Sequence, residues 1–177
     1  MQEILQGNAA LIEALGALCT RDKAIHHSTD AYGNAFHWFR LDHPRFMSQA
    51  ATALQGAHAR LITAYNLKQL GEQQQELCYH FELQGVVYNI TVTLTAEHNT
   101  VPSITPLFAN ADWHEREMME LYGIRVANQP NPRRLFLDEE LDAGILNEAV
   151  PLSIMMNGAC TTDLWERILK EKEGERA

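Results

Sequence analysis

Two segments on either side of Gln84-Gly85 constrain the fold of this chain most strongly. In residues 77–83 (LCYHFEL) and 86–94 (VVYNITVTL), large apolar side chains occupy every second position. Successive side chains of a β-strand point to opposite faces of a sheet, so this period predicts two strands that each bury one face. Because Gln84-Gly85 suits a two-residue turn, the two strands are predicted to form an antiparallel hairpin.

The residues before the hairpin predict further helices and strands. Apolar residues at helical spacing predict a helix over residues 2–18, and residues 34–41 and 59–67 are strand-like. A second helix is predicted to start at Asp42 and to end at Gly56. Its buried stripe is expected to consist of Phe46, Met47, Ala50, Ala51 and Leu54. This order predicts an α+β fold, with a mostly antiparallel sheet and helices packed on one face.

The composition changes after about residue 96. Five of the six prolines follow this point, and the strand period disappears. Short helices are expected at 112–122 and at 163–174. We therefore expect an α+β core domain over residues 1–107. Residues 108–177 are expected to form a helix and an extended, Pro-rich, partner-docking arm that lies along a neighbouring subunit.

Composition also excludes several classes of protein. The formal net charge of −9 is opposite to the basic surface of a nucleic-acid-binding protein. Cys19, Cys78 and Cys160 are scattered and odd in number, which is typical of reduced thiols in the cytosol. No run of about 18 apolar residues predicts a membrane span, and the acidic N-terminal stretch does not resemble a signal peptide. We expect a cytoplasmic protein that reaches a membrane only through a partner.

Residues 112–122 concentrate charged side chains and raise the question of catalysis. His114-Glu115 begins like the zinc-protease motif H-E-x-x-H, but Met118 stands where the second histidine would be. Glu117 and Glu120 are neighbours on one helix face, as an acid–base pair would be. A free-standing enzyme that uses Glu115, Glu117 and Glu120 for acid–base or metal chemistry is therefore the alternative hypothesis.

A structural interpretation of the same helix needs no catalysis. Asp112, Arg116 and Glu120 are spaced for an i, i+4 ladder of charges, with Asp112 also capping the start of the helix. Met118 and its neighbours form the apolar side, and Gly123 is expected to close the helix.

Other motifs indicate little chemistry. Nucleotide-binding glycine loops and the serine-hydrolase motif are absent from the sequence, and no cofactor is predicted. The adjacent pair His26-His27 is predicted to lie in a solvated loop. Cys78 alternates outward from the apolar row of the hairpin and has no base nearby in the sequence, so a nucleophile is not predicted there. Arg133-Arg134 follows a rigid Pro-Asn-Pro stretch and suits bidentate contacts with carboxylates of a partner.

The region around these motifs resembles a known family. Residues 101–124 (VPSITPLFANADWHEREMMELYGI), followed by NPRRLFL at 131–137, closely resemble the signature of the 30 kDa (C-type) subunit of respiratory complex I. The same subunit type occurs in energy-converting, membrane-bound NiFe hydrogenases and formate hydrogenlyases. The matching positions are Pro102, Ser103, Trp113, Glu115, Arg116, Glu117, Glu120, Tyr122, Gly123, Ile124, Arg133, Arg134 and Leu135.

The resemblance implies a non-catalytic, cofactor-free subunit of the hydrophilic arm, peripheral to the inner membrane as part of a complex. Such a subunit docks onto and stabilises the large catalytic subunit (49 kDa or hydrogenase large-subunit-like), beside an iron–sulfur subunit. The residues expected to form the docking surface are Trp113, Glu115, Arg116, Glu117, Glu120, Tyr122, Gly123, Arg133 and Arg134.

The chain departs from the family pattern at two places. Asn128-Gln129-Pro130 replaces the usual Gly-His-Pro, while Tyr122-Gly123 and the segment 102–106 look more like the hydrogenase and formate hydrogenlyase branch. Later, Pro151-Leu152 continues as Ser153-Ile154-Met155 in place of Arg-Lys-Asp. This second departure removes a basic pair from the expected final contact with the catalytic subunit.

Overall fold

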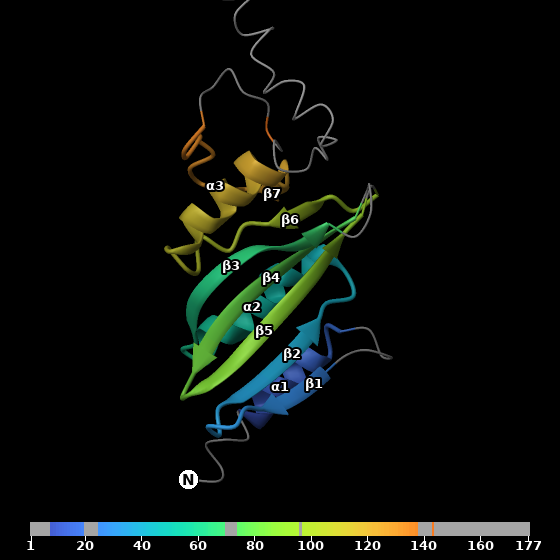
Figure 1. Cartoon of the computed structure of the whole chain (residues 1–177), viewed down its shortest axis with the longest axis vertical. Coiled ribbons are helices and arrows are strands. Elements are labelled where there is room, and N and C mark those ends of the chain that lie inside the picture. The colour runs from blue at the N-terminus through green and yellow to red at the C-terminus, as the bar shows by residue number, and fades with distance from the viewer. Residues whose placement is uncertain (1–7, 20–24, 70–73, 96, 138–142, 144–177) are drawn as a thin grey trace, which may run out of the picture. The chain divides into compact units, whose positions relative to one another are not determined.

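A five-stranded sheet forms the centre of the computed structural model, which describes residues 8–19, 25–69, 74–95, 97–137 and 143 (Figure 1). The strands are β1 (Ile25–Thr29), β2 (Ala35–Arg40), β3 (Arg60–Gln69), β4 (Gln75–Leu83) and β5 (Val86–Leu94), in the spatial order β1-β2-β5-β4-β3. Neighbouring strands are antiparallel except β2 and β5, which are parallel. The predicted α+β class with a mostly antiparallel sheet is therefore confirmed.

The predicted hairpin is β4 and β5. Leu83 pairs with Val86, and the two residues between them, Gln84 and Gly85, have φ angles of 52° and 81°. Positive φ at both central residues is the backbone of a type I′ turn, whose twist matches that of two antiparallel strands. The large side chains that are fully buried in these strands are Leu77, Tyr79, Phe81, Tyr88, Ile90 and Val92.

Helices α1 (Ala9–Gly16) and α2 (Met47–Gly56) cover one face of this sheet (Figure 1). In α1, Leu11 and Leu15 are buried in the core. Asn8, which falls inside the longer helix predicted over residues 2–18, is the N-cap of α1, and its side-chain oxygen accepts from the Leu11 amide at 3.1 Å. Residues 2–7 of the predicted helix lie outside the described part of the chain.

The start of the second helix differs from the prediction. A 3-10 turn, η2 (Pro44–Phe46), precedes α2, and the side chain of His43 caps it by accepting from the Arg45 amide at 3.1 Å. Asp42 as the helix start is therefore wrong, because the proline at the first position already suits a cap at residue 43. The predicted stripe is confirmed in α2, where Met47, Ala50, Ala51 and Leu54 are fully buried and Phe46 packs partly buried beside them.

Strand β1 was missed. His26 and His27 were predicted in a solvated loop; they are exposed, as predicted, but they lie in this strand, so the loop is wrong. β1 is an edge strand that pairs with β2 alone, and both histidines are exposed. An edge strand with little buried surface leaves no alternation of apolar residues for sequence reasoning to detect.

Residues 100–127 contribute helix α3 (Ala111–Tyr122) and a small parallel sheet of β6 (Thr100–Pro102) and β7 (Arg125–Ala127), all within the compact unit Met1–Asn147. The predicted helix at 163–174, Cys160 and the segment at 151–155 lie outside the described residues. The division between a core over 1–107 and an arm over 108–177 stays a prediction.

Candidate functional site

Helix α3 carries most of the predicted site, and both of its ends are defined. Gly123 adopts the left-handed conformation (φ 63°), and its amide donates to the Met118 carbonyl. This confirms the predicted closure, because glycine takes this conformation without a steric cost. At the other end Asn110 is the N-cap residue and makes no side-chain cap. The predicted capping role of Asp112 is wrong, since Asp112 lies inside the first turn.

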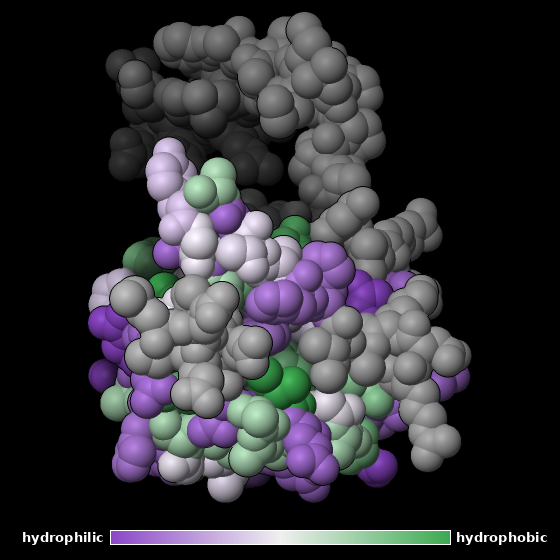
Figure 2. All heavy atoms as spheres, turned by 90° about the horizontal axis from the view of Figure 1, so that it is seen from below, coloured by the Kyte–Doolittle hydropathy of each residue, from purple (hydrophilic) through white to green (hydrophobic). Residues whose placement is uncertain are grey.

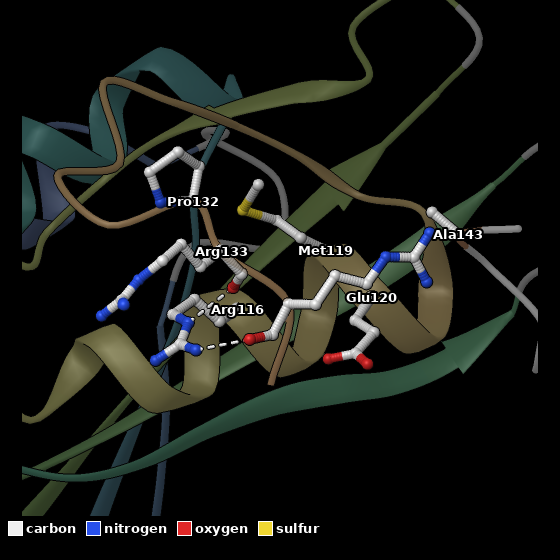
Figure 3. Close-up of a pocket in the computed structure, with 7 residues that line it drawn as sticks. Arg116, Met119, Glu120, Pro132, Arg133 and Ala143 are labelled. Carbon is white, nitrogen blue, oxygen red and sulfur yellow. Dashed lines mark hydrogen bonds between the residues drawn. The ribbon is translucent and has the colours of Figure 1, made fainter. Parts of the chain in front are cut away.

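Arg116 connects the helix to the segment that follows β7. Its Nη1 donates to Asp112 at 3.3 Å, which confirms one step of the predicted ladder. Its Nε and Nη2 donate to the carbonyl oxygens of Arg133 and Arg134 at 2.8 Å and 2.7 Å. Figure 3 shows the guanidinium of Arg116, with dashed lines to the carbonyl oxygens of Arg133 and Arg134. Arg116 therefore fixes the course of the chain at these two residues.

Glu120, one turn further along α3, binds the same segment through its amides. The Leu135 amide donates to Oε2 at 2.7 Å, the Phe136 amide donates to both oxygens at 3.1 Å, and the Leu137 amide donates to Oε1. Burial alone would raise the pKa of Glu120, but these three amides and the nearby Arg134 hold it below the ordinary value. The carboxylate therefore stays ionised and caps three consecutive backbone donors.

We name the segment of residues 133–137 the latched arm, because Arg116 and Glu120 hold it by its backbone. The side chains of Arg133 and Phe136 are exposed, whereas those of Arg134, Leu135 and Leu137 are partly buried. Phe136 is 61% exposed and lies edge-on to Trp113, which is 60% exposed, with ring centroids 6.0 Å apart. The other large apolar side chains exposed in the described residues are Tyr32, Ile62, Tyr65 and Leu67. In the view of Figure 2, hydrophilic and apolar residues are interspersed over the described surface.

A small pocket of about 130 Å³ lies between α3 and the latched arm (Figure 3). It is lined by Arg116, Met119, Glu120, Pro132, Arg133, Arg134 and Ala143. The two arginines predicted as partner contacts therefore lie at one pocket with Arg116 and Glu120.

Glu115 has a different role, as a completely buried carboxylate. Its Oε2 accepts from Ser103 Oγ at 2.6 Å, Thr105 Oγ1 at 2.8 Å and Gln129 Nε2 at 2.9 Å, and its Oε1 accepts from the Ile104 amide at 2.6 Å. The side chain of Glu115 therefore hydrogen-bonds to residues 103–105, which precede α3, and to Gln129, which follows it.

No cation pairs with Glu115 among the ion pairs of the described residues. Burial raises the pKa of the Glu115 carboxyl above its ordinary value, although hydrogen bonds from Ser103, Ile104 and Thr105 act in the opposite direction. The folded state therefore binds the proton more tightly than the unfolded state does.

This raised pKa predicts a pH dependence of stability. Below the ordinary pKa of 4.5, the residue is protonated in both states; above it, the unfolded state loses the proton first, so stability falls as pH rises through the folded-state pKa. Urea denaturation of the wild type and of Glu115→Gln, compared from pH 4 to pH 8, measures this effect. The stability of the wild type relative to the variant is expected to decrease as pH rises, and an increase would contradict the assignment.

The two remaining predicted side chains are Tyr122 and Glu117. Tyr122 packs partly buried against the core, and its carbonyl accepts from Gln75 Nε2 at 3.1 Å. Glu117 is half-buried on α3. The docking role of the nine predicted residues stays a prediction.

The three glutamates do not form a common reactive centre. Glu115 is enclosed by donors from residues 103–105 and 129, whereas Glu120 is occupied by the amides of the latched arm. Within the described residues, no group of three or more His, Cys, Asp and Glu side chains is placed to hold a metal ion. The geometry therefore favours the structural interpretation of this helix over acid–base chemistry.

Three contributors were missed by sequence reasoning. Gln129 donates to Glu115, Thr105 donates to the same carboxylate, and Phe136 meets Trp113. The polar residues gave no pattern of their own, since each acts through a partner ten or more positions away. Phe136 gave a weak signal, as a large apolar residue shortly after a charged pair in a region without strand period.

Comparison with known proteins identifies the family. The sequence model of the family described as "Respiratory-chain NADH dehydrogenase, 30 Kd subunit" matches residues 41–158, which is about two thirds of the chain. The chain belongs to this family. The matched span includes α2, β3, β4, β5, α3 and the latched arm, so the family resemblance predicted from the signature is confirmed.

Relatives of this 30 kDa-subunit family member are subunits of quinone oxidoreductases. It is 36% identical over 87 residues to "NAD(P)H-quinone oxidoreductase subunit J" of Synechococcus sp. (strain RCC307), covering 49% of this chain and 46% of that one. It is 37% identical over 83 residues to the C-type subunit of the NADH-quinone oxidoreductase of Azorhizobium caulinodans, covering 46% and 39%. The chain therefore spans about half the length or less of these curated relatives.

The fold also has a solved counterpart. A chain of the membrane-bound sulfane sulfur reductase, described as an archaeal respiratory membrane complex, superposes with a TM-score of 0.53 and 12% sequence identity. The match covers 80% of this chain and 76% of the other. At this identity the likeness concerns the fold alone. In the part of the chain that the structure describes, no helix is long and apolar enough to cross a membrane.

Proposed function

We propose that this chain is a non-catalytic subunit that docks onto the large catalytic subunit of a complex I-like oxidoreductase and stabilises it, beside an iron–sulfur subunit. Membership of the 30 kDa-subunit family supports a role inside a multi-subunit respiratory complex. No cofactor is assigned to the chain itself. Its place would be the hydrophilic arm, peripheral to the inner membrane, on the cytoplasmic side.

The observation that carries the proposal is that side chains of α3 hydrogen-bond to the backbone of the latched arm. Arg116 binds two carbonyl oxygens and Glu120 binds three amides, so half of the backbone polar groups of residues 133–137 are bound by α3. The exposed side chains of Arg133 and Phe136 are available to contact another subunit. Aromatic residues and arginines are enriched among residues that dominate protein–protein binding, and both are presented here.

In this proposal the nine predicted residues divide into two groups. Glu115, Arg116, Glu120 and Gly123 shape the surface, because their contacts lie within the chain. Trp113, Glu117, Arg133 and Arg134 are the candidates for direct contact, with Tyr122 at the border between the groups. In this proposal the basic pair of the latched arm contacts carboxylates of the partner.

The type of complex is the finer part of the proposal. Tyr122-Gly123 and the segment 102–106 favour the hydrogenase or formate hydrogenlyase type. The names of the relatives favour NADH:quinone oxidoreductase. The identity of the subunits that co-purify with the chain decides between the two.

The test is co-purification of the tagged full-length chain with the products of the neighbouring genes. The wild type is expected to recover a large catalytic subunit and an iron–sulfur subunit. Glu117→Ala and Arg134→Ala are each expected to reduce that recovery about tenfold, a typical cost for truncating an important interface residue. Both variants should retain the circular dichroism spectrum of the wild type. Recovery of the wild type without any oxidoreductase subunit would overturn the proposal.

A further inference from the structure

We infer, on the basis of the proposed docking role, that Asn131 is a positioning residue of the docking surface. Its side chain orients the guanidinium of Arg133 for contact with the large subunit, and Gln129 holds Asn131 in place. Asn131 therefore contributes to docking through Arg133 and not through a contact of its own with the partner. Neither Asn131 nor Gln129 belongs to the site predicted from the sequence.

Arg133 is held at two points. Its carbonyl oxygen accepts from Arg116 Nε at 2.8 Å, and its own Nε donates to Asn131 Oδ1 at 2.8 Å. The guanidinium is planar, so a bond at Nε restricts both the direction and the plane of the group. The side chain of Arg133 is exposed and extends away from Glu120 (Figure 3). In the described part of the chain, no residue accepts from its two Nη groups, which are the donors left for a partner.

Asn131 has little freedom to leave this position. A proline stands on each side of it in the sequence, which restricts its backbone to extended conformations. Its amide donates to Gln129 Oε1 at 2.8 Å, and its Nδ2 donates to Asp112 Oδ2 at 3.5 Å. Because the amide nitrogen of the side chain faces the carboxylate of Asp112, the oxygen Oδ1 is the atom that faces Arg133.

Gln129 connects Asn131 to the interior of the protein. It is buried, and its Nε2 donates to Glu115 Oε2 at 2.9 Å while its Oε1 accepts from the Asn131 amide. A carboxamide carries a donor and an acceptor, so one side chain makes both contacts. Asn128, the preceding residue, has a φ of 59°, a left-handed conformation that asparagine adopts more readily than most residues. The place of Asn131 is therefore set by the buried network around Glu115.

Orientation in advance affects docking because a long side chain loses conformational freedom when it binds. Immobilising such a side chain at an interface typically lowers affinity by about 2- to 10-fold. The contact with Asn131 restricts Arg133 when the subunit folds, so less freedom is lost when it docks. Removing the side chain of Asn131 should weaken docking by this factor although Arg133 is still present.

Nitrogen-15 relaxation of the Arg133 side chain tests the orientation in the free, full-length chain. The Nε–H resonance is assigned by its disappearance in Arg133→Lys. Its heteronuclear NOE should be close to the backbone values in the wild type and should fall in Asn131→Ala. Asn34→Ala, a matched control that changes an exposed asparagine in the turn between β1 and β2, should leave it unchanged. A mobile Arg133 side chain in the wild type, or an unchanged one in Asn131→Ala, would overturn the inference.

A competition experiment tests the effect on docking. Wild-type and variant chains with different tags are co-expressed with the large and iron–sulfur subunits, and the share of each in the assembled complex is measured. Asn131→Ala should lower its share by about 2- to 10-fold and Arg133→Ala by about tenfold, whereas Asn34→Ala should match the wild type. The double variant should lose no more than Arg133→Ala alone, because Asn131 acts through Arg133.

The outcomes separate this inference from the proposed function. Additive losses in the double variant would show that Asn131 acts independently of Arg133. A full share for Asn131→Ala would show that the orientation does not matter for docking. Either result overturns the inference and leaves the proposed function in place. Failure of the wild type to assemble with the large subunit would instead overturn the proposed function and, with it, the role of Asn131 in docking.

Discussion

Replacing Glu115 with alanine is expected to lower the free energy of unfolding by about 3 kcal/mol or more. The substitution removes the acceptor of four hydrogen bonds and leaves the Ile104 amide, two hydroxyls and the Gln129 amide group without their partner. Each buried donor without an acceptor costs about 1–3 kcal/mol, and the space left by the side chain adds to this cost. Urea denaturation followed by tryptophan fluorescence measures the effect as a shift of the midpoint by about 1 M or more.

Glu117→Ala is the matched control for this measurement. It removes a carboxylate from the same helix, two positions away, at a half-buried site. Its effect on stability should stay within about 0.5 kcal/mol, as is usual for substitutions away from buried features. An effect of Glu115→Ala equal to that of the control would show that the buried network does not hold the segments around α3.

Replacing Glu120 with alanine is expected to release the latched arm while the sheet stays folded. Three consecutive amides, those of Leu135, Phe136 and Leu137, lose their acceptor. Hydrogen bonds to a charged group contribute about 1.5–3 kcal/mol each, so amide protection in this segment should fall by about 10- to 100-fold. Hydrogen exchange measured by mass spectrometry on peptides that contain residues 133–137 checks this, with peptides from β4 and β5 expected to exchange as in the wild type.

Glu117→Ala again serves as the control, because it changes the same net charge without touching the arm. Unchanged protection of residues 135–137 in Glu120→Ala would show that other contacts hold the arm. Glu120→Ala is also expected to weaken co-purification with the large subunit. Its released arm would have to be ordered again on binding, which costs conformational entropy. A fully folded core with a poorly assembling subunit is therefore the expected combination.

The parts of the fold that the sequence predicted are those with strong periodicity. The alternation on both sides of Gln84-Gly85 defined β4, β5 and their turn, and the apolar stripe defined α2. Strand β1 and the parallel pairing of β2 with β5 were not predicted. β1 has little buried surface, and the pairing of β2 joins residues about 50 positions apart, which local patterns do not encode.

The sequence predicted which residues form the candidate site better than it predicted what those residues contact. The helix, its closure at Gly123 and the pair of Asp112 with Arg116 followed from spacing along the helix. That Glu115 faces inward and Glu120 faces the arm could not follow, because Ser103, Gln129 and Leu135–Leu137 reach α3 only after the chain folds back. A cluster of charges in a sequence gives no indication of which members are buried.

The grip of α3 on the latched arm has a consequence for divergence within the family. Arg116 and Glu120 recognise carbonyl oxygens and amides, and every residue type except proline offers both groups. The course of residues 133–137 is thus independent of the side chains at these positions. If the exposed side chains of this segment contact a partner as proposed, mutations there would alter partner recognition while the backbone contacts with α3 are kept. Under that proposal, partner choice and the position of the segment depend on different residues.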